Sequence, residues 1–303
     1  MKKEDAILSF HAGEFGWEIL RTAPHIIWYK KQNPNAKLIV CTREDRYDLY
    51  GKYANIYEPL KIEGDGSEYK GNCFTLTNFP ESEYYALSQN FRKKFERKFN
   101  ILKYICPEVK NKQFTRKDQF NAKQMIYDFE PRKENKLLID SMCLDEKPIV
   151  VLAPRYRKGF PRNWNHWETL YDLIHKNEFL NNFNFVLCGK SPDYISDKYN
   201  RFFDINKVML TTNTSLVGIT IEVIKRSVLV CGSQSGIPNL SNLIGTPTLQ
   251  WGHQEWFHSK TYNVKNTKTK FISCKTKNDF NTISPKVIFK ELKDQLRGKE
   301  IKK

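Results

Sequence analysis

Short apolar or β-branched runs alternate with helix-like segments along most of this 303-residue chain. This alternation is typical of βαβ units, in which helices join parallel strands and cover the sheet. Two parallel strands cannot be joined by a tight turn, so a chain with this pattern is strongly restricted in fold. We expect strands at residues 6–10, 38–41, 73–76, 149–153, 185–188, 208–210, 228–231 and 248–251.

The second half of the chain has the clearer pattern. Helices are expected at 167–175, 216–225 and 239–243, each between two strands. A terminal helix should follow Ser284-Pro285, an N-cap and a first-turn proline, because Ile288, Leu292 and Leu296 recur every four residues. Residues 129–147 are rich in Lys, Glu, Asp and Pro and precede the strongest strand. We therefore predict an α/β protein with a domain boundary near 145.

Composition limits the environment of the protein. With 40% hydrophobic residues the chain can bury large cores, and no apolar run approaches the roughly 18 residues that cross a bilayer. The seven cysteines include no C-x-x-C pair, which favours a reducing compartment. We expect a cytoplasmic protein without a signal peptide, in a bacterial cell or a phage-infected host and possibly peripheral to a membrane.

The net charge of +16 is concentrated in two regions. Residues 91–136 hold 14 basic and 6 acidic residues, net +8, and residues 264–303 hold 12 and 4, again net +8. Such regions suit a polyanion such as nucleic acid, anionic lipid headgroups or a phosphorylated substrate. They also suit a solvated lysine-rich surface, and the sequence leaves both interpretations open.

The segment from Val228 to Thr248 suggests a phosphate site. A buried strand ends in Gly232, a turn containing Ser233 and Ser235 follows, and a helix begins near Pro238. The free N–H groups and positive dipole of such a helix attract phosphate, and ligands of open α/β sheets bind at this edge. An ordinary strand-to-helix turn would use the same residue types.

A basic loop follows the strand at 149–153. It contains Arg155, Arg157, Lys158 and Arg162. If this loop and the Ser235-Gly236 turn share one sheet edge, these cations would face a bound diphosphate. The alternative is a solvated loop.

These residues resemble a known family. Arg162-Asn163-Trp164 before a helix, then Cys188-Gly189, then the run from Ser233 to Thr248 and Trp251-Gly252 are similar to the donor domain of heptosyltransferase-type glycosyltransferases. The chain departs from that pattern at Asn163, Gln234 and Asn239, where the family commonly has Arg, Asp and His. The resemblance implies the GT-B architecture: an acceptor-binding Rossmann-like domain over 1–145, a donor-binding one over 146–275, and a helix in 276–303 that crosses back to the first domain.

The resemblance also implies roles for residues. When Pro24 is matched to a family proline, Glu18 falls at the position of the base that deprotonates the acceptor, and Glu14 is the rival for this role. Alternatively, both carboxylates could stabilise the start of the helix through its dipole. The N-terminal loop, with His11, Gly13 and Gly16, would contact the acceptor. The nucleotide-sugar donor would be bound by Arg155, Lys158, Arg162, Gly189, Ser233, Gln234, Ser235, Gly236 and Ile237.

The implied activity is inverting transfer of a hexosyl, pentosyl or heptosyl group. No Asp-x-Asp pair or metal-ligand spacing of histidines occurs, so we expect no metal and no cofactor beyond the nucleotide-sugar co-substrate. The acceptor would be a surface or lipid-linked glycan. Two alternatives remain: a phage-type enzyme that modifies a hydroxymethylated pyrimidine in DNA, and a GT-B binding module without catalysis. Hydrolase, kinase and classical dehydrogenase functions lose support because G-x-S-x-G, P-loop and G-x-G-x-x-G motifs are absent.

Overall fold

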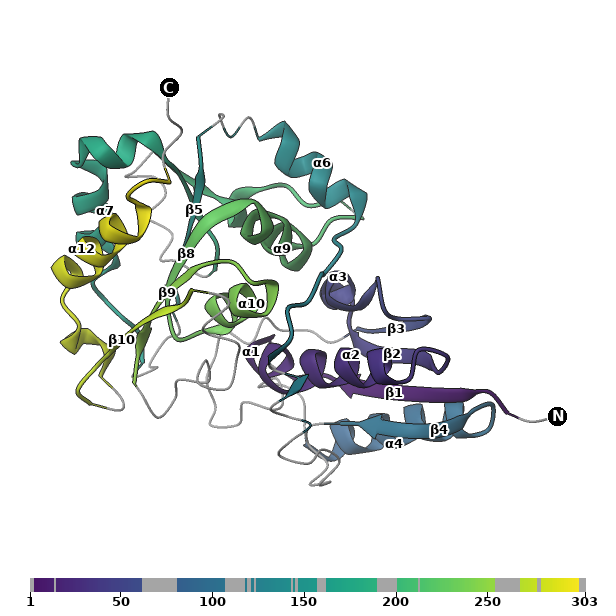
Figure 1. The fold of residues 1–303 in the computed structure, drawn as a ribbon. Coiled ribbons are helices and arrows are strands. Elements are labelled where there is room, and N and C mark those ends of the chain that lie inside the picture. The colour runs from purple at the N-terminus through teal and green to yellow at the C-terminus, as the bar shows by residue number, and fades with distance from the viewer. Residues whose placement is uncertain are drawn as a thin grey trace. The chain divides into compact units, whose positions relative to one another are not determined.

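The chain forms two compact α/β units, unit 1 over residues 1–130 and unit 2 over residues 131–303. The structure is a computed structural model (Figure 1). It describes residues 3–13, 15–61, 81–106, 118, 121–122, 124–142, 144, 147–156, 162–189, 201–211, 213–253, 268–276 and 279–299.

Unit 1 contains, within its described residues, a parallel sheet with strand order β3-β2-β1-β4. The strands are β1 (Asp5–His11), β2 (Lys37–Arg43), β3 (Ile56–Leu60) and β4 (Asn100–Ile105). The helices are α1 (Phe15–Trp17), α2 (Ala23–Gln32), α3 (Tyr47–Tyr50) and α4 (Glu81–Glu96), with a π-helical turn at Glu18–Thr22 and a 3₁₀ turn at Glu44–Arg46.

Helices cover both faces of this sheet, with α4 on the opposite face from α2 and α3 (Figure 1). Phe91 and Phe95 of α4 pack with Leu8 and Phe10 of β1. The strand β1 is buried from its second residue onward, because it is an inner strand with helices on both sides.

Unit 2 has a parallel sheet with strand order β10-β9-β8-β5-β6-β7. Its strands are β5 (Ile149–Ala153), β6 (Asn184–Leu187), β7 (Phe202–Asp204), β8 (Ser227–Ser233), β9 (Thr248–Gly252) and β10 (Lys270–Ser273). Its helices include α6 (Lys133–Ser141), α7 (Trp167–His175), α9 (Leu216–Arg226), α10 (Gly236–Ile244) and α12 (Pro285–Leu296). Single 3₁₀ turns lie at Glu178–Asn182, Ile205–Lys207 and Phe280–Thr282.

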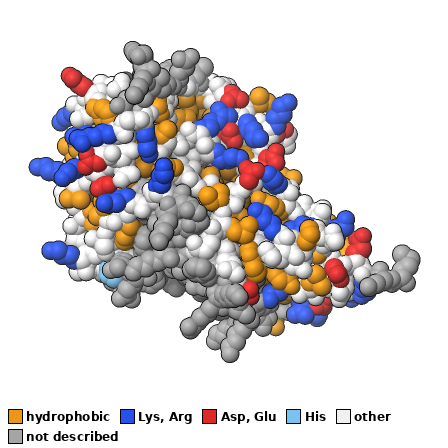
Figure 2. Space-filling view, viewed as in Figure 1, with side chains coloured by type: hydrophobic (Ala, Val, Ile, Leu, Met, Phe, Trp, Pro, Cys, Tyr) orange, Lys and Arg blue, Asp and Glu red, His pale blue; other side chains and the backbone are white. Residues whose placement is uncertain are grey.

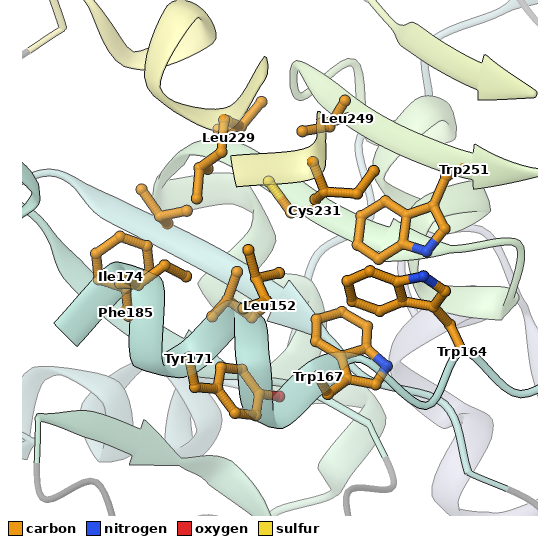
Figure 3. Packing of buried hydrophobic residues seen from close by; sticks show 14 of the residues in the cluster. Leu152, Trp164, Trp167, Tyr171, Ile174, Phe185, Leu229, Cys231, Leu249 and Trp251 are labelled. Carbon is orange, nitrogen blue, oxygen red and sulfur yellow. The ribbon is translucent and has the colours of Figure 1, made fainter. Parts of the chain in front are cut away.

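Three tryptophans dominate the core on the α7 and α12 side of this sheet (Figure 3). The Trp164 ring packs edge-on against those of Trp167 and Trp251, at centroid distances of 5.2 and 4.9 Å. The Trp164 indole N–H donates to the carbonyl oxygen of Ile283 at 2.9 Å, so the loop after β5 is fixed to the segment before α12. The packing of these large rings therefore stabilises the carboxyl end of the sheet.

The fold confirms the predicted α/β class and differs from the expected elements in places. Residues 208–210 form no strand, because the Met209 and Leu210 side chains are exposed; the strand is β7, whose Phe202 packs against Phe185. The strands β3, β4 and β10 were not predicted. The segment 73–76 lies outside the described residues.

The units divide at Glu130–Pro131, before α6, whereas the sequence suggested 145. The helix α6 packs with unit 2: Asn135 accepts from the Ser215 N–H at 3.0 Å, and Arg226 pairs with Asp140 at 2.6 Å. The expected terminal helix is present as α12, and its buried residues Ile288, Leu292 and Leu296 belong to the core of unit 2. That the C-terminal segment crosses back to the first domain stays a prediction. No helix in the described ranges is both long and apolar enough to cross a bilayer.

Candidate functional site

At its carboxyl edge, the unit 2 sheet has a topological switch point at β5, where the order of successive strands reverses. The strand β5 is flanked by β6 on one side and β8 on the other, so the loops after β5 and β8 leave the sheet side by side. Arg155, just after β5, donates from Nη1 to the backbone oxygen of Gln234, just after β8, at 2.9 Å. Ligands of open α/β sheets bind at this kind of edge.

The helix α10 starts at this edge. Ser235 is its N-cap, and the Ser235 side chain makes no capping hydrogen bond. The backbone N–H groups of Gly236 and Ile237, in the first turn, have no acceptor within the helix. Together with the helix dipole they favour a bound anion at this position.

Several buried polar atoms at the same edge have no hydrogen-bond partner among the described residues. They are Ser233 Oγ, both amide atoms of Gln234, Gln250 Oε1 and Trp251 Nε1. The Ser233 side chain is fully buried and Gln234 is only 7% exposed. Buried polar groups are nearly always paired in folded proteins, so such a concentration indicates a place for a polar ligand or ordered water.

Close packing at this edge requires glycine at two positions. Gly189, after β6, has a φ of +112°, and a Cβ there would lie 2.6 Å from the Pro154 carbonyl oxygen. Gly252, at the end of β9, has a φ of +157°, and a Cβ there would lie 2.5 Å from Oε1 of Gln234. The missing side chain at 252 leaves the space in which the Gln234 amide lies.

The other predicted donor residues are placed as follows. Ser235, Gly236 and Ile237 are partly buried, as are Arg155, Arg162 and Gly189, and Asn163 is buried. Asn239 accepts a long hydrogen bond of 3.4 Å from the Gln250 amide. Lys158 lies outside the described residues. The structure thus brings Arg155, Gln234 and the start of α10 together.

Unit 1 contains the predicted catalytic residue Glu18 at the start of the π-helical turn. Its side chain is fully buried. Oε1 accepts from the Thr42 hydroxyl at 2.9 Å and from the Tyr50 hydroxyl at 2.8 Å. Oε2 lies 3.5 Å from Nε of Arg46 and accepts no hydrogen bond in the described part of the chain. Wide helical turns of this kind are frequent at functional sites.

Burial raises the pKa of Glu18 to about 7. The nearby Arg46 charge and the hydrogen bonds from Tyr50 and Thr42 act in the opposite direction and only partly offset burial. The Arg46 guanidinium is itself nearly buried and lies over the Phe15 ring at 4.6 Å. This carboxyl group therefore changes protonation near neutral pH, which suits a group that takes up a proton.

The other N-terminal candidates lie near the end of β1. His11 is buried, and its Nδ1 lies 3.2 Å from the Thr22 hydroxyl. Gly13 is buried and Gly16 is partly buried in α1. Glu14 lies outside the described residues.

Sequence reasoning missed the partners of Glu18. Thr42 ends the buried part of β2, and Arg46 and Tyr50 follow within the next two turns. The strand β2 pairs with β1 in parallel, with His11 opposite Thr42. The sequence signal that could have identified these partners was the group of polar residues at and just after the end of the strand expected at 38–41.

In the described ranges no three His, Cys, Asp or Glu side chains are grouped so as to hold a metal ion.

Comparison with solved structures shows the fold. A glycosyltransferase family 9 protein from Veillonella parvula has a TM-score of 0.62 at 13% identity, with 97% of each chain covered. ADP-heptose lipopolysaccharide heptosyltransferase II of E. coli has a TM-score of 0.60 at 11% identity, covering 96% of this chain and 98% of that one. The E. coli heptosyltransferase WaaC, solved with ADP-2-deoxy-2-fluoro heptose, has a TM-score of 0.56 at 11% identity, covering 95% and 99%.

No protein-family model and no curated protein sequence matches the chain. The similarity is thus one of fold, and it confirms the resemblance to GT-B structures of the heptosyltransferase type over nearly the whole chain.

Proposed function

We propose that this protein is a glycosyltransferase that moves a sugar from a nucleotide-sugar donor to an acceptor hydroxyl, with inversion and without a metal. Unit 2 would bind the donor, and unit 1 would supply the base. The observation that carries the proposal is the group of unpaired buried polar atoms beside Arg155 and the start of α10, at the switch point of the unit 2 sheet. In the WaaC structure of the same fold, the bound molecule is ADP-2-deoxy-2-fluoro heptose.

The donor diphosphate fits the chemistry of this edge. Backbone N–H groups of Gly236 and Ile237 and the Arg155 guanidinium would hold its oxygens, with Lys158 and Arg162 as further cations. As the bond between the anomeric carbon and the diphosphate breaks, the leaving group gains negative charge, which these groups stabilise. The unpaired Gln234 amide supplies a donor and an acceptor for sugar hydroxyls.

The acceptor oxygen would attack the anomeric carbon from the side opposite the diphosphate, and its proton would pass to a carboxylate. Glu18 suits this role through its pKa of about 7 and its oxygen Oε2, which accepts no hydrogen bond among the described residues. Its full burial means that an acceptor must reach it through local rearrangement. Glu14 is the other candidate for the base, and separate Gln variants distinguish the two.

We propose a glycan, at the cell surface or linked to a lipid, as the acceptor. The rival DNA acceptor would need aromatic side chains available beside the basic residues for contacts to flipped or single-stranded bases. Phe91, Phe95 and Tyr104 are buried in the core of unit 1 and cannot serve in that way.

Thermal unfolding with ADP, UDP, GDP and CMP tests the donor site, because a ligand of the folded state raises its stability. We expect one of these nucleotides to raise the melting temperature. Arg155→Ala should reduce that shift, whereas Arg297→Ala, at an exposed arginine of the C-terminal segment, should leave it unchanged. No shift with any nucleotide, in a protein that melts cooperatively, would contradict the proposal.

Incubation with the matching nucleotide-sugar then tests transfer. We expect the nucleoside diphosphate to be released faster in the presence of a glycan acceptor than by hydrolysis of the donor in its absence. Transfer to hydroxymethylated DNA would establish the rival acceptor. Nucleotide binding without turnover on either acceptor class would favour the binding module.

A further inference from the structure

Three carboxamide side chains lie together between β9 and the first turn of α10 in unit 2. Gln250 donates from Nε2 to Oδ1 of Asn239 at 3.4 Å, which joins the strand to the helix. Gln250 and Gly252 share one face of β9, because alternate residues of a strand point to the same side. The Gln234 amide lies in the space over Gly252, so it is on the same face as Gln250. We call Gln234, Asn239 and Gln250 the carboxamide group.

The carboxamide group is buried and has few hydrogen bonds. All three residues are less than a tenth exposed, and Gln250 is only 1% exposed. Among the described residues, the bond between Gln250 and Asn239 is the one hydrogen bond that these side chains make. Both amide atoms of Gln234 and Oε1 of Gln250 have no partner there. Buried amides are nearly always paired, so the carboxamide group lacks partners that a ligand can supply.

The unused atoms include both donors and acceptors. A carboxamide carries an NH₂ group and an oxygen, whichever way round the amide lies. Besides its one internal bond, the carboxamide group offers donors from Gln234 and Asn239, and acceptors from Gln234 and Gln250. A hydroxyl both donates and accepts, so neighbouring hydroxyls can pair with both kinds of atom. A carboxylate only accepts and an ammonium only donates, so either would leave some of these atoms unpaired.

The elements around the carboxamide group are uncharged. Neither α10 nor β9 contains a charged residue, and the atoms of α10 in Figure 2 are accordingly neither blue nor red. Arg155 contacts Gln234 through the backbone oxygen and not through the amide. Gln234 and Asn239 also stand where the heptosyltransferase-type family commonly has Asp and His, so neutral amides replace two titratable groups. A charged substituent would be buried here without a counter-charge on either element, which is costly.

We propose that the carboxamide group selects a donor whose sugar is uncharged, through hydrogen bonds of Gln234 and Asn239 to neighbouring sugar hydroxyls. Gln250 is a positioning residue, because its bond to Oδ1 of Asn239 leaves the Asn239 N–H groups for the sugar. This inference rests on the proposed donor site and adds the class of sugar that the site accepts. Ordered water is the alternative occupant of the carboxamide group.

Isothermal titration measures how much the sugar adds to nucleotide binding. The probes are UDP, ADP and GDP, then UDP-glucose, ADP-glucose and GDP-mannose, then the matching uronates, in which the C6 alcohol is oxidised to a carboxylate. For the nucleotide that binds, we expect the neutral conjugate to bind about tenfold more tightly, as two or three neutral hydrogen bonds would give. The uronate should bind no more tightly than the nucleotide alone. A uronate that binds as tightly as the neutral conjugate would overturn the proposal.

Gln250→Leu tests the positioning role, since leucine has a similar size and no amide. It should lower affinity for the neutral conjugate about 3–10-fold, as loss of one neutral hydrogen bond does, and leave affinity for the nucleotide unchanged. The melting temperature of the ligand-free protein should change little, because the variant loses one long bond and one unpaired oxygen. A purely structural role predicts the reverse: a lower melting temperature and an unchanged gain from the sugar.

Gln295→Leu is the matched control, because it removes a carboxamide that donates to Glu291 within α12. We expect it to keep both affinities. If Gln234→Leu and Gln250→Leu bind the neutral conjugate as the wild type does, water occupies the carboxamide group and only this inference is overturned. If the wild type binds none of the nucleotides, the proposed donor site fails, and this inference fails with it.

Discussion

Glu18 is held by residues from three separate segments of unit 1. Thr42, Arg46 and Tyr50 come from β2, the turn after it and α3, and the first and third donate hydrogen bonds to the same carboxylate oxygen. Such an arrangement fixes the side chain while burial keeps its pKa near neutrality. The same residue can thus hold the N-terminal loop in place and exchange a proton.

We predict that Glu18→Gln abolishes transfer, since a carboxamide cannot accept the proton. A lost general base costs about 10²–10⁴-fold in turnover. In the wild type, turnover should rise with pH through about 7, as Glu18 becomes ionised, and the variant should lose this dependence. Initial rates of nucleotide release from pH 5 to 9 measure both effects.

Glu44→Gln, at an exposed carboxylate in the turn after β2, is the matched control and should behave as the wild type. Glu14→Gln is the decisive companion. If it abolishes turnover while Glu18→Gln retains it, the base is Glu14 and Glu18 is a positioning residue.

Glu18 should also affect stability in a pH-dependent way. Its pKa in the folded protein is raised from 4.5 to about 7, so the folded state binds the proton more tightly than the unfolded state. The resulting stabilisation is complete below about pH 4.5 and is lost as pH rises to 7. Unfolding free energies from urea titrations at several pH values should therefore fall less steeply for Glu18→Gln than for the wild type. Equal slopes would show that Glu18 does not titrate in this window.

At the scale of elements, the proposed donor site depends on how β8, β9 and α10 meet. Just after the end of β8, the Gln234 N–H donates a hydrogen bond to the Trp251 backbone oxygen in β9 at 2.8 Å. The N-cap of α10, Ser235, is the next residue. The Gln234 side chain lies where a side chain at 252 would otherwise be. The end of β9, which is the next element after α10 in the chain, therefore also shapes the proposed site.

We predict that Gly252→Ala weakens nucleotide-sugar binding at least tenfold. The new Cβ would lie 2.5 Å from Gln234 Oε1, so the amide must move. Overpacking of this kind costs about 1–3 kcal/mol. Gly298→Ala is the control, because Gly298 also has a positive φ, +77°, but a Cβ there meets nothing within 4 Å. Isothermal titration of both variants measures the difference, and equal affinities would remove Gln234 from the site.

At the scale of the whole molecule, the two units divide the proposed tasks. The unpaired polar atoms and the start of α10, where we propose that the diphosphate binds, belong to unit 2, and Glu18 belongs to unit 1. The similarity in fold to solved glycosyltransferase structures extends over both units.

We predict that a bound nucleoside diphosphate protects unit 2 most strongly from hydrogen exchange. Protection should be greatest at residues 233–240 and 153–156, around the switch point, because these amides would contact the diphosphate or become shielded by it. Mass-spectrometric exchange on the full chain with and without the nucleotide measures this. Protection limited to residues 5–60 would place the nucleotide in unit 1 instead.

The sequence by itself determined the class of fold and much of unit 2. The strand β5 and the helix α7 have the predicted bounds, and α12 begins at the predicted Ser284-Pro285 cap, because strand runs, helical spacing and helix caps are local signals. The strand-turn-helix from β8 to α10 was predicted for the same reason, although α10 begins three residues earlier than expected. The local pattern also gave one wrong prediction. Residues 208–210 have the apolar sequence of a strand, but Met209 and Leu210 are exposed and form none.

Only the tertiary structure decided which polar residues meet. The partners of Glu18, the contact of Arg155 with Gln234 and the space left by Gly252 all join residues from different strands. The pKa of Glu18 is likewise set by burial, which the glutamate and its neighbours in sequence do not specify. The physical reason is that secondary structure follows from interactions within a few residues, whereas a site is made where parallel strands end together and long-range packing excludes water.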